Sequence, residues 1–234
     1  MDRIVVIGAR SGSKRVPNKN IRLIGDIPLI AYTLEKADKL QYPTYVSSES
    51  DEILDIVEFY SSAHTIKRPA ELASDTATDI DWIKHLLIQS IDEKRGSFPE
   101  QVILLRPTTP LRCVRTLLRA INEFDSTKFT SLRSVEEMSE SCYKKFKINN
   151  GILEGFSNEY KDLPNQSVPH TYTGNGYIDI LLTTQIMEED DMYGNKIQPF
   201  ITENTVEIDT ENDLNYMDYL IKEQNGPLLR KSCH

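Results

Sequence analysis

A cluster of positively charged side chains lies close to the amino terminus. Residues 8–20, GARSGSKRVPNKN, follow the apolar run RIVVI and combine cations with glycine and serine. Arginine and lysine bind polyphosphates strongly, and small residues let backbone N–H groups approach the same oxygens. The stretch therefore predicts a site for a polyphosphate, with a solvated basic loop as the alternative. The cations are Arg10, Lys14, Arg15, Lys19 and Arg22.

Neither of the two common phosphate-binding turns fits this stretch. A P-loop has the form GxxxxGK[ST], but Gly8 and Gly12 lie too close together, and Arg15 stands where the metal-binding hydroxyl is needed. A Rossmann turn opens directly into a helix. Here Pro17 interrupts the segment, and the next helix is predicted only from residue 28. The pattern indicates a long loop that binds phosphate with side-chain cations.

The elements that must position this loop alternate along the first half of the chain. Short β-branched runs predict buried strands, and apolar residues at helical spacing predict amphipathic helices. The predicted strands are 3–8, 44–48, 64–67 and 101–107, and the predicted helices are 28–40, 50–60, 79–94 and 114–124.

This alternation favours an α/β fold with a mostly parallel sheet and helices on both faces. Ligands bind outside the carboxyl ends of such strands. The loops after Ile7, Ser48 and Leu105 are therefore predicted to face one cleft.

The second half of the chain has a different character. Residues 143–156 predict a β-hairpin around NNG, and the polar segment 159–176 predicts a binding loop or an arm for a partner. Strands are predicted at 177–183 and 204–209, and a helix at 210–224 with Thr210 as its N-cap. We expect a single domain over 1–225, with 134–175 as an inserted arm and 226–234 as a loose tail.

Composition and charge limit the classes of partner. The chain has 234 residues and a net charge of −9, which makes bulk attraction to nucleic acid or to an anionic membrane unlikely to drive binding. We find no apolar run near the roughly 18 residues that span a bilayer, and no signal-peptide pattern. We therefore expect a cytoplasmic protein without nucleic-acid or membrane partners. The three cysteines and four histidines are scattered, so they predict neither a disulfide framework nor a zinc site.

Six motifs follow one another over nearly the whole chain. They are ARSGSKRVPNKN (9–20), SSESDEI (47–53), KRPAELASDTA (67–77), LLRPTTPLR (104–112), NGYIDI (175–180) and VEIDTENDL (206–214). Together they resemble the CMP-sialic acid synthetase family, the acylneuraminate cytidylyltransferases. The resemblance implies a Rossmann-like fold of the nucleotide-diphospho-sugar transferase type, with a small β-hairpin insertion that serves dimerisation in a homodimer.

The same resemblance implies a reaction. CMP passes from CTP to the anomeric hydroxyl of a nonulosonic acid, and pyrophosphate is released. Catalysis then consists mainly of positioning and charge neutralisation. By resemblance Arg10, Lys19 and Asp209 are catalytic, and the nucleotide is bound by Ala9, Arg10, Ser13, Lys14, Lys19, Asn20, Arg68 and Ala77.

A carboxylate-bound Mg²⁺ is the cofactor that this reaction implies, and it points to Glu207 and Asp209. The two acids lie two apart in a predicted strand, so both side chains should project to the same face. A strand packed on a core rarely points two acids one way without a cation. The alternative is an acidic stripe on an exposed edge strand. The family pattern has Asp at position 207, so Asp209 is the safer ligand.

The sugar side departs from the family pattern. Arg106 stands where glutamine is common, Thr173 and Gly174 replace Arg-Pro, and Asp179 replaces a tyrosine. We expect Arg106 to pair with the sugar carboxylate in place of the arginine missing at position 173. Asp179 contacts the sugar or is only a turn-end acid. The residues expected around the sugar are Arg106, Thr108, Thr109, Asn175, Gly176 and Asp179, with helix capping as the alternative role of the two threonines.

These departures leave the sugar open among the sialic, legionaminic and pseudaminic types. Two alternative functions are kept. One is a cytidylyltransferase for 3-deoxy-manno-octulosonate, whose loop resembles ARYASTRLPGKP rather than the loop found here. The other is a catalytically inactive paralogue that only binds nucleotide.

Overall fold

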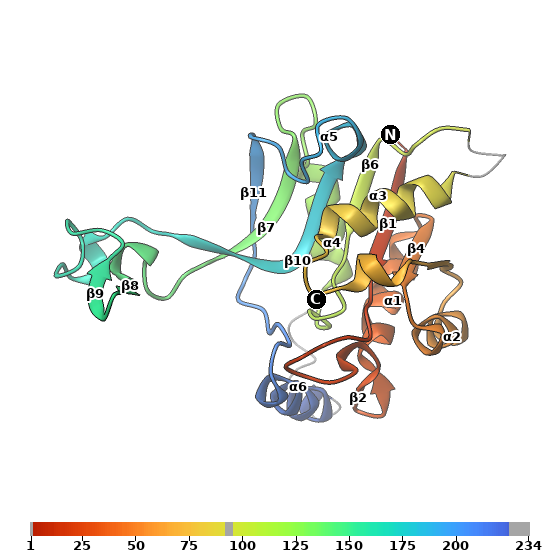
Figure 1. The fold of residues 1–234 in the computed structure, drawn as a ribbon, viewed down its shortest axis with the longest axis horizontal. Helices are drawn as coiled ribbons and strands as arrows, with labels where there is room; N and C mark the ends of the chain where they lie inside the picture. The colour runs from red at the N-terminus through yellow and green to blue at the C-terminus, as the bar shows by residue number, and fades with distance from the viewer. Residues whose placement is uncertain (1, 92–95, 225–234) are drawn as a thin grey trace.

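The computed structural model describes residues 2–91 and 96–224 (Figure 1). Within them a seven-stranded sheet has the order β11-β7-β10-β6-β1-β4-β5. Strands β6, β1, β4 and β5 run parallel, β10 runs antiparallel to both of its neighbours, and β11 runs parallel to β7. The strands are β1 (Arg3–Gly8), β4 (Thr44–Ser48), β5 (His64–Lys67), β6 (Gln101–Leu104), β7 (Ser131–Glu137), β10 (Tyr172–Leu182) and β11 (Ile197–Ile201).

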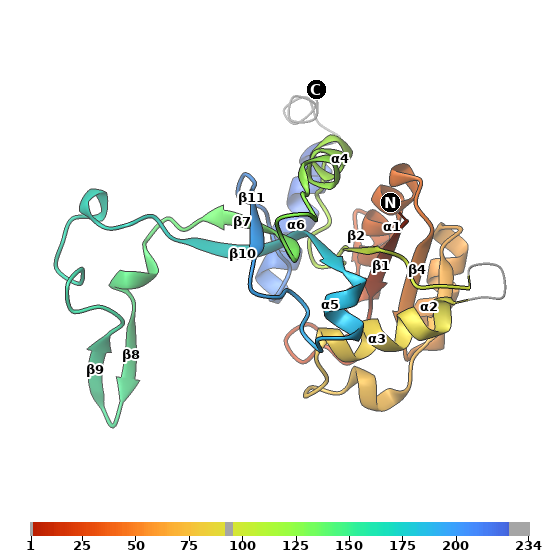
Figure 2. The same cartoon turned by 90° about the horizontal axis from the view of Figure 1, so that it is seen from above.

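Helices cover both faces of this sheet (Figure 2). Along β1, Val5 and Ile7 face a core shared with α1, α2 and α4, whereas Ile4 and Val6 face a core shared with α3 and α5. The alternation of a strand thus supplies two apolar faces. The helices are α1 (Leu29–Leu40), α2 (Asp51–Tyr60), α3 (Asp79–Ser90), α4 (Val114–Glu123), α5 (Thr183–Met187) and α6 (Glu211–Gln224).

The predicted fold class, a Rossmann-like α/β fold with helices on both faces, is confirmed. Among the described helices, none is both long enough and apolar enough to cross a membrane. The predicted helix 79–94 ends at Ser90, and residues 92–94 and the predicted tail 226–234 lie outside the described residues.

A smaller core lies beside the main sheet. Ile24 of the hairpin of β2 (Leu23–Ile24) and β3 (Ile27–Pro28) packs, together with Leu29 at the start of α1, against Leu214 and Met217 of α6. Ile208 is buried in the same cluster. This packing holds the segment before α6 close to the loop that follows β1.

The predicted hairpin at 143–156 is present and stands away from the rest of the molecule (Figures 1 and 2). Strands β8 (Phe146–Asn149) and β9 (Ile152–Gly155) form a separate two-stranded sheet. Asn150 (φ 49°) and Gly151 (φ 79°) join them, which is the turn that the NNG sequence favours. The outer parts of β7 and β10 carry this hairpin outward as a paired ribbon.

The sequence prediction of strands was wrong at four places. Strands β7 and β11 were missed, and β10 begins at Tyr172 rather than at 177. Residues 202–209 form no strand, although a strand was predicted at 204–209. Val206 and Ile208 alternate as in a strand, but Ile208 instead fills the core against α6, and its backbone N–H donates to the Thr108 carbonyl at 2.8 Å.

Candidate active site

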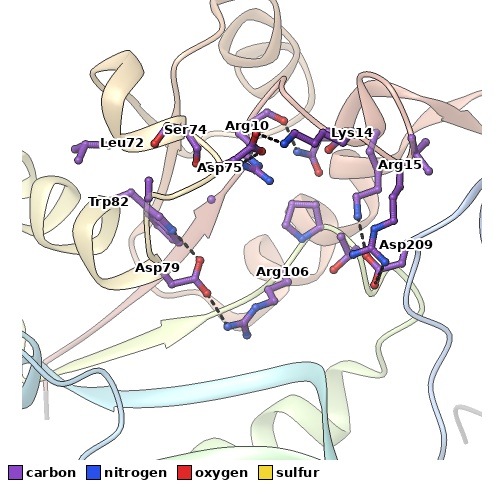
Figure 3. A pocket seen from close by; sticks show the side chains of 18 of the residues that line it. Arg10, Lys14, Arg15, Leu72, Ser74, Asp75, Asp79, Trp82, Arg106 and Asp209 are labelled. Atoms are coloured by element: carbon purple, nitrogen blue, oxygen red, sulfur yellow. Dashed lines mark hydrogen bonds and ion pairs between the residues drawn. The ribbon is translucent and has the colours of Figure 1, made fainter. Parts of the chain in front are cut away.

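A cavity of about 480 Å³ opens at the carboxyl ends of β1 and β6 (Figure 3). The loop after β1 and the loop after β6 both line it, as the sequence predicts. The loop after Ser48 does not line it, although it was expected to. Its Glu49 instead accepts hydrogen bonds from the backbone N and Oγ of Ser11, both at 2.7 Å, and so supports the first loop from behind.

The cavity brings together most of the predicted nucleotide residues. Those that line it are Arg10, Ser13, Lys14, Lys19, Asn20, Arg68, Ala77, Arg106, Thr108 and Asp209. The other predicted residues lie behind or beside it, namely Ala9, Thr109, Asn175, Gly176, Asp179 and Glu207. Several lining residues were not named as site residues, among them Ser74, Asp75, Asp79 and Trp82, whereas Gly8 and Arg15 belong to the predicted polyphosphate-binding stretch.

The segment after β1 is a loop, as expected from Pro17. Its single helical turn is the 3-10 helix η1 (Lys19–Ile21), the β2–β3 hairpin follows, and the first α-helix begins at Leu29. Asn18 adopts the left-handed conformation (φ 53°) just before η1. The buried Asn20 donates from Nδ2 to the Arg10 carbonyl at 2.8 Å, which folds the loop back on itself. The cations therefore converge on the cavity without a helix N-terminus.

Two carboxylates face these cations across the cavity (Figure 3). Asp75 lies 2.6 Å from Lys14 Nζ and 3.4 Å from Arg10 Nη1. The hydrogen bond from Lys14 holds the pKa of Asp75 below its usual range. Asp75 therefore occupies, in this structure, the position that an anionic ligand of Lys14 and Arg10 would take.

Asp209 faces the other two cations. Its Oδ1 lies 3.3 Å from Lys19 Nζ, and its Oδ2 lies 3.5 Å from Arg15 Nη1. Lys19 Nζ also donates to the Ile208 carbonyl at 2.7 Å. The fifth cation of the stretch, Arg22, pairs with Glu211 at 2.8 Å and does not line the cavity.

Trp82 of α3 forms one wall of the cavity. A Cβ added to Gly8 would lie 2.6 Å from Trp82 Cζ2, so the glycine lets the indole pack directly on the end of β1. Arg68 stacks on the same indole ring, 5.0 Å from its centroid. Arg68 is buried, and burial lowers its pKa to about 10.

The two unusual residues of the sugar side, Arg106 and Asp179, contact each other. Arg106 Nη1 lies 2.5 Å from Asp179 Oδ2, and Arg106 Nη2 lies 3.0 Å from Asp79 Oδ2 at the start of α3. Tyr193 OH donates to the same Asp179 oxygen at 3.1 Å. Burial lowers the pKa of Arg106, but attraction by Asp179 and Asp79 outweighs burial and raises it overall.

A bulge in β10 contains Asn175 and Gly176, the first two residues of the NGYIDI motif. The pairing of β10 with β7 shifts register between Gly174 and Asp179, and Gly176 there adopts φ 64°. A Cβ at Gly176 would lie 3.2 Å from Thr109 Oγ1 and 3.5 Å from Glu207 Oε1. The glycine therefore permits both the backbone conformation and the close approach.

Arg112 fastens this bulge to the loop after β6, a role that the sequence interpretation missed. The side chain is buried, and its guanidinium donates to the carbonyls of Tyr177 (2.6 Å), Arg106 (2.6 Å) and Gly176 (2.9 Å), and to Thr33 Oγ1 (3.1 Å). The one available signal was its place in the LLRPTTPLR motif.

The geometry separates the two acids that were predicted to hold a metal. They do not lie on a strand, and Asp209 lines the cavity whereas Glu207 does not. Glu207 Oε1 accepts from Thr108 Oγ1 at 3.2 Å. Within residues 2–91 and 96–224, no group of three or more His, Cys, Asp or Glu side chains is arranged to hold a metal ion alone.

The two threonines do not cap the following helix, because α4 begins at Val114 with Cys113 as its N-cap. Thr108 lines the cavity and bonds Glu207. Thr109 is fully buried, and its hydroxyl has no hydrogen-bond partner among the described residues.

A mostly parallel α/β sheet with a cation-lined cavity at its carboxyl edge is typical of nucleotide-binding α/β proteins. The family model described as Cytidylyltransferase matches residues 4–225. The chain belongs to this cytidylyltransferase family, and the resemblance carried by the six motifs is confirmed.

Several relatives match nearly the whole chain. Post-translational flagellin modification protein B of Campylobacter coli is 31% identical over 228 residues, 95% of this chain and 96% of that protein. CMP-N,N'-diacetyllegionaminic acid synthase of Legionella pneumophila is 30% identical, covering 90% and 92%. Pseudaminic acid cytidylyltransferase of Campylobacter jejuni is 25% identical, covering 95% and 97%.

A solved structure shows the same fold. CMP:2-keto-3-deoxy-manno-octonic acid synthetase, complexed with CTP, superposes with a TM-score of 0.73 and covers 96% of this chain and 100% of its own. The sequence identity is 16%, so this likeness concerns the fold alone.

Proposed function

We propose that this protein transfers CMP from CTP to the anomeric hydroxyl of a nonulosonic acid. The observation that carries the proposal is the convergence of Arg10, Lys14, Arg15 and Lys19 on one cavity beside the half-exposed carboxylate of Asp209. The names of the Legionella and Campylobacter relatives support a legionaminic or pseudaminic type of acid. Their identities of 25–31% do not choose between the types.

The reaction needs the triphosphate held by cations. The anomeric oxygen forms a bond to the α-phosphorus and gives up its proton, while the bond from that phosphorus to the β-phosphate oxygen breaks. The leaving pyrophosphate gains negative charge, which Arg10, Lys14 and Lys19 neutralise. These side chains exchange Asp75 and Asp209 for phosphate oxygens when CTP enters. Ala9, Ser13, Asn20, Arg68 and Ala77 complete the nucleotide side of the proposed site.

Mg²⁺ is the cofactor that we assign to this site. Mg²⁺ is typically held by one or two carboxylates together with substrate phosphates rather than by a closed protein cage. Asp209, with its carboxylate 45% exposed at the cavity, fits this pattern. Glu207 fits it less well, because its carboxylate bonds Thr108 outside the cavity wall. Bound there, Mg²⁺ would neutralise phosphate charge.

The sugar would lie on the side of the cavity bounded by β6 and the β10 bulge. This side carries Arg106, Thr108, Thr109, Asn175, Gly176 and Asp179. The paired Arg106 and Asp179 present a wall with little net charge. We assign this wall to the hydroxyl and amide groups of the sugar, which hydrogen-bond without charge.

A pyrophosphate-release assay tests the function. Purified protein with CTP and Mg²⁺ should release pyrophosphate with at least one of N-acetylneuraminic, N,N'-diacetyllegionaminic and pseudaminic acids. UTP in place of CTP should give little release. Release with 3-deoxy-manno-octulosonate alone would favour the alternative cytidylyltransferase. No release with any of the four acids would favour an inactive nucleotide-binding paralogue.

We further propose that the protein is a cytoplasmic homodimer, with the β8–β9 hairpin reaching toward the sugar side of a second copy. The need for CTP supports the location. The projecting hairpin and its apolar surface support the dimer, because exposed apolar patches of this kind mark interaction sites.

A further inference from the structure

Arg133 of β7 lies beside Asp179 and does not itself line the cavity, and it belongs to none of the six motifs. The cross-strand register places Leu104 of β6, Asp179 of β10 and Arg133 of β7 in one row. Directly opposed residues project to the same face of a sheet. Because Leu104 lines the cavity, Arg133 lies on the face of the sheet that holds it, one strand beyond Asp179.

Arg106 is poorly placed to bind a further carboxylate. One of its terminal nitrogens pairs with Asp179 at 2.5 Å and the other with Asp79 at 3.0 Å. A sugar carboxylate brought to Arg106 would also approach these two negative charges. Like charges at such distances repel strongly at a site shielded from water.

Arg133 keeps its donors available. Its Nε lies 4.0 Å from Asp179 Oδ1, which is beyond the roughly 2.7–2.9 Å of a charge-assisted hydrogen bond. Within residues 2–91 and 96–224 this is its one ion pair, and its side chain is 41% exposed. The guanidinium lies 4.5 Å from the centroid of the Tyr193 ring, which holds its plane in place by stacking.

Gly174 makes this position of Arg133 possible. A Cβ at Gly174 would lie 2.9 Å from Arg133 Nε and 3.0 Å from its Nη2. At positions 173 and 174, where the resembling family has Arg-Pro, this chain has Thr-Gly. Compared with Arg-Pro, the Thr-Gly pair lacks the arginine at position 173. Its glycine at position 174 leaves room for the side chain of Arg133.

We propose that Arg133 binds the carboxylate of the sugar acid and so decides that the second substrate is an acid. The inference rests on the proposed function, since it assigns a residue to the second substrate of that reaction. A planar guanidinium and a carboxylate form two parallel hydrogen bonds. The Arg106–Asp179 pair forms the adjoining wall, and Arg106 does not bind the carboxylate of the sugar acid.

The first test compares Arg133→Gln and Arg133→Lys with the wild type, using the nonulosonic acid that the wild type accepts. Arg133→Gln should raise the KM for the acid by about 10- to 100-fold, the loss expected for a charge-assisted hydrogen-bonded pair. The KM for CTP should stay within about twofold of wild type. Arg133→Lys should recover part of the loss, because it keeps the charge without the planar fork.

The control is Arg119→Gln. Arg119 of α4 is also an exposed arginine stacked on an aromatic ring, 4.8 Å from the centroid of Phe200, but on the opposite face of the sheet. It should leave both KM values unchanged. Melting temperatures of all variants show whether each is folded.

A second test uses the substrate with its carboxylate converted to a carboxamide. The wild type should prefer the acid over the amide by about 10- to 100-fold, and Arg133→Gln should lose most of this preference. Gly174→Ala leaves Arg133 in the chain but fills its space, and should weaken the preference by several-fold.

The outcomes distinguish the two levels of the proposal. If the wild type turns over a nonulosonic acid but Arg133→Gln keeps its full preference for acid over amide, the role of Arg133 is overturned and the reaction stands. If the wild type accepts no acid of the panel, both proposals fall together.

Discussion

At the scale of single residues, the four cations of the loop after β1 that line the cavity all pair with carboxylates of the same chain. Asp75 forms ion pairs with Lys14 and Arg10, and Asp209 forms ion pairs with Lys19 and Arg15. These pairs are partly exposed, so each contributes little to stability. The ion pairs instead hold the cations in position before the substrate binds. An incoming triphosphate then replaces the carboxylates of Asp75 and Asp209 as the partners of these cations.

Asp209→Asn tests the acid that we assign to Mg²⁺. The amide keeps the shape but removes the charge, so kcat should fall by about 10²–10³-fold, as for other groups that act on transition-state charge. The melting temperature should change by only a few degrees, since Asp209 is 45% exposed. Steady-state pyrophosphate release across a Mg²⁺ titration provides the measurement.

Glu211→Gln is the matched control. Glu211 follows Asp209 by two residues, pairs with Arg22 and lies outside the cavity. It should keep activity within about twofold of wild type. Near-normal turnover of Asp209→Asn at saturating Mg²⁺ would contradict the assignment.

Gly8→Ala tests the contact between β1 and Trp82. The added Cβ would lie 2.6 Å from the indole, so the ring must move, at a cost of about 1–3 kcal/mol in unfolding free energy. Trp82 is the only tryptophan of the chain, and its fluorescence therefore reports the displacement directly. The KM for CTP should rise with it.

Gly12→Ala serves as the comparison. A Cβ at Gly12 meets no atom within 4 Å, so fluorescence and melting temperature should match those of the wild type. An unchanged tryptophan spectrum in Gly8→Ala would show that the end of β1 yields instead of the ring.

At the scale of elements, the sugar side depends on the bulge in β10. A regular strand would continue its pairing with β7 through residues 174–179, and its backbone would stay within the sheet. The bulge brings Gly176 close to Thr109 and Glu207. Bulges of this kind commonly redirect side chains next to active sites.

Arg112→Met tests what holds the bulge in place. The change leaves the carbonyls of Gly176 and Tyr177 without this donor, whereas the Arg106 carbonyl keeps the Thr109 backbone N–H at 3.3 Å. Each unsatisfied buried group costs about 1–3 kcal/mol, so the free energy of unfolding should fall by about 2–5 kcal/mol. Urea denaturation measures the loss.

Arg119→Met, which alters an exposed arginine of α4, should cost less than about 1 kcal/mol. A loss for Arg112→Met no larger than this would show that the bulge holds its conformation without the guanidinium.

At the scale of the whole molecule, a sheet covered on both faces contrasts with an uncovered hairpin (Figure 1). Phe146, Ile148 and Leu153 lie on one face of the β8–β9 hairpin and are exposed, Ile148 by 77%. The ion pair Lys147–Glu154, at 3.3 Å, lies on the other face. Such a two-stranded hairpin is marginal by itself, which supports its burial against a second copy.

Ile148→Asp tests the proposed homodimer. A charge at the centre of the apolar face should convert the dimer into a monomer at micromolar concentration, as measured by light scattering after size exclusion. Phe59→Asp changes a side chain of α2 that is 81% exposed and remote from the hairpin. It should leave the dimer intact. A monomeric wild type would refute the proposed assembly.

The sequence by itself determined the parallel half of the sheet and the nature of the cavity. Strands β1, β4, β5 and β6 and the first four α-helices follow from short-range patterns, because each carries its apolar periodicity within its own residues. The loop of Arg10 to Lys19 was predicted for a similar reason. Its cations and Pro17 are local features whose chemistry needs no distant contact.

Only the tertiary structure decided the carboxyl-terminal half and the sugar side. Strand β7 pairs with a strand more than thirty residues away, and the alternating VEID segment packs on α6 instead of joining the sheet. The pairing of Arg106 with Asp179, the neighbouring position of Arg133 and the fastening by Arg112 join residues from different strands and loops. No local pattern records such contacts, because they arise only when the strands align in register.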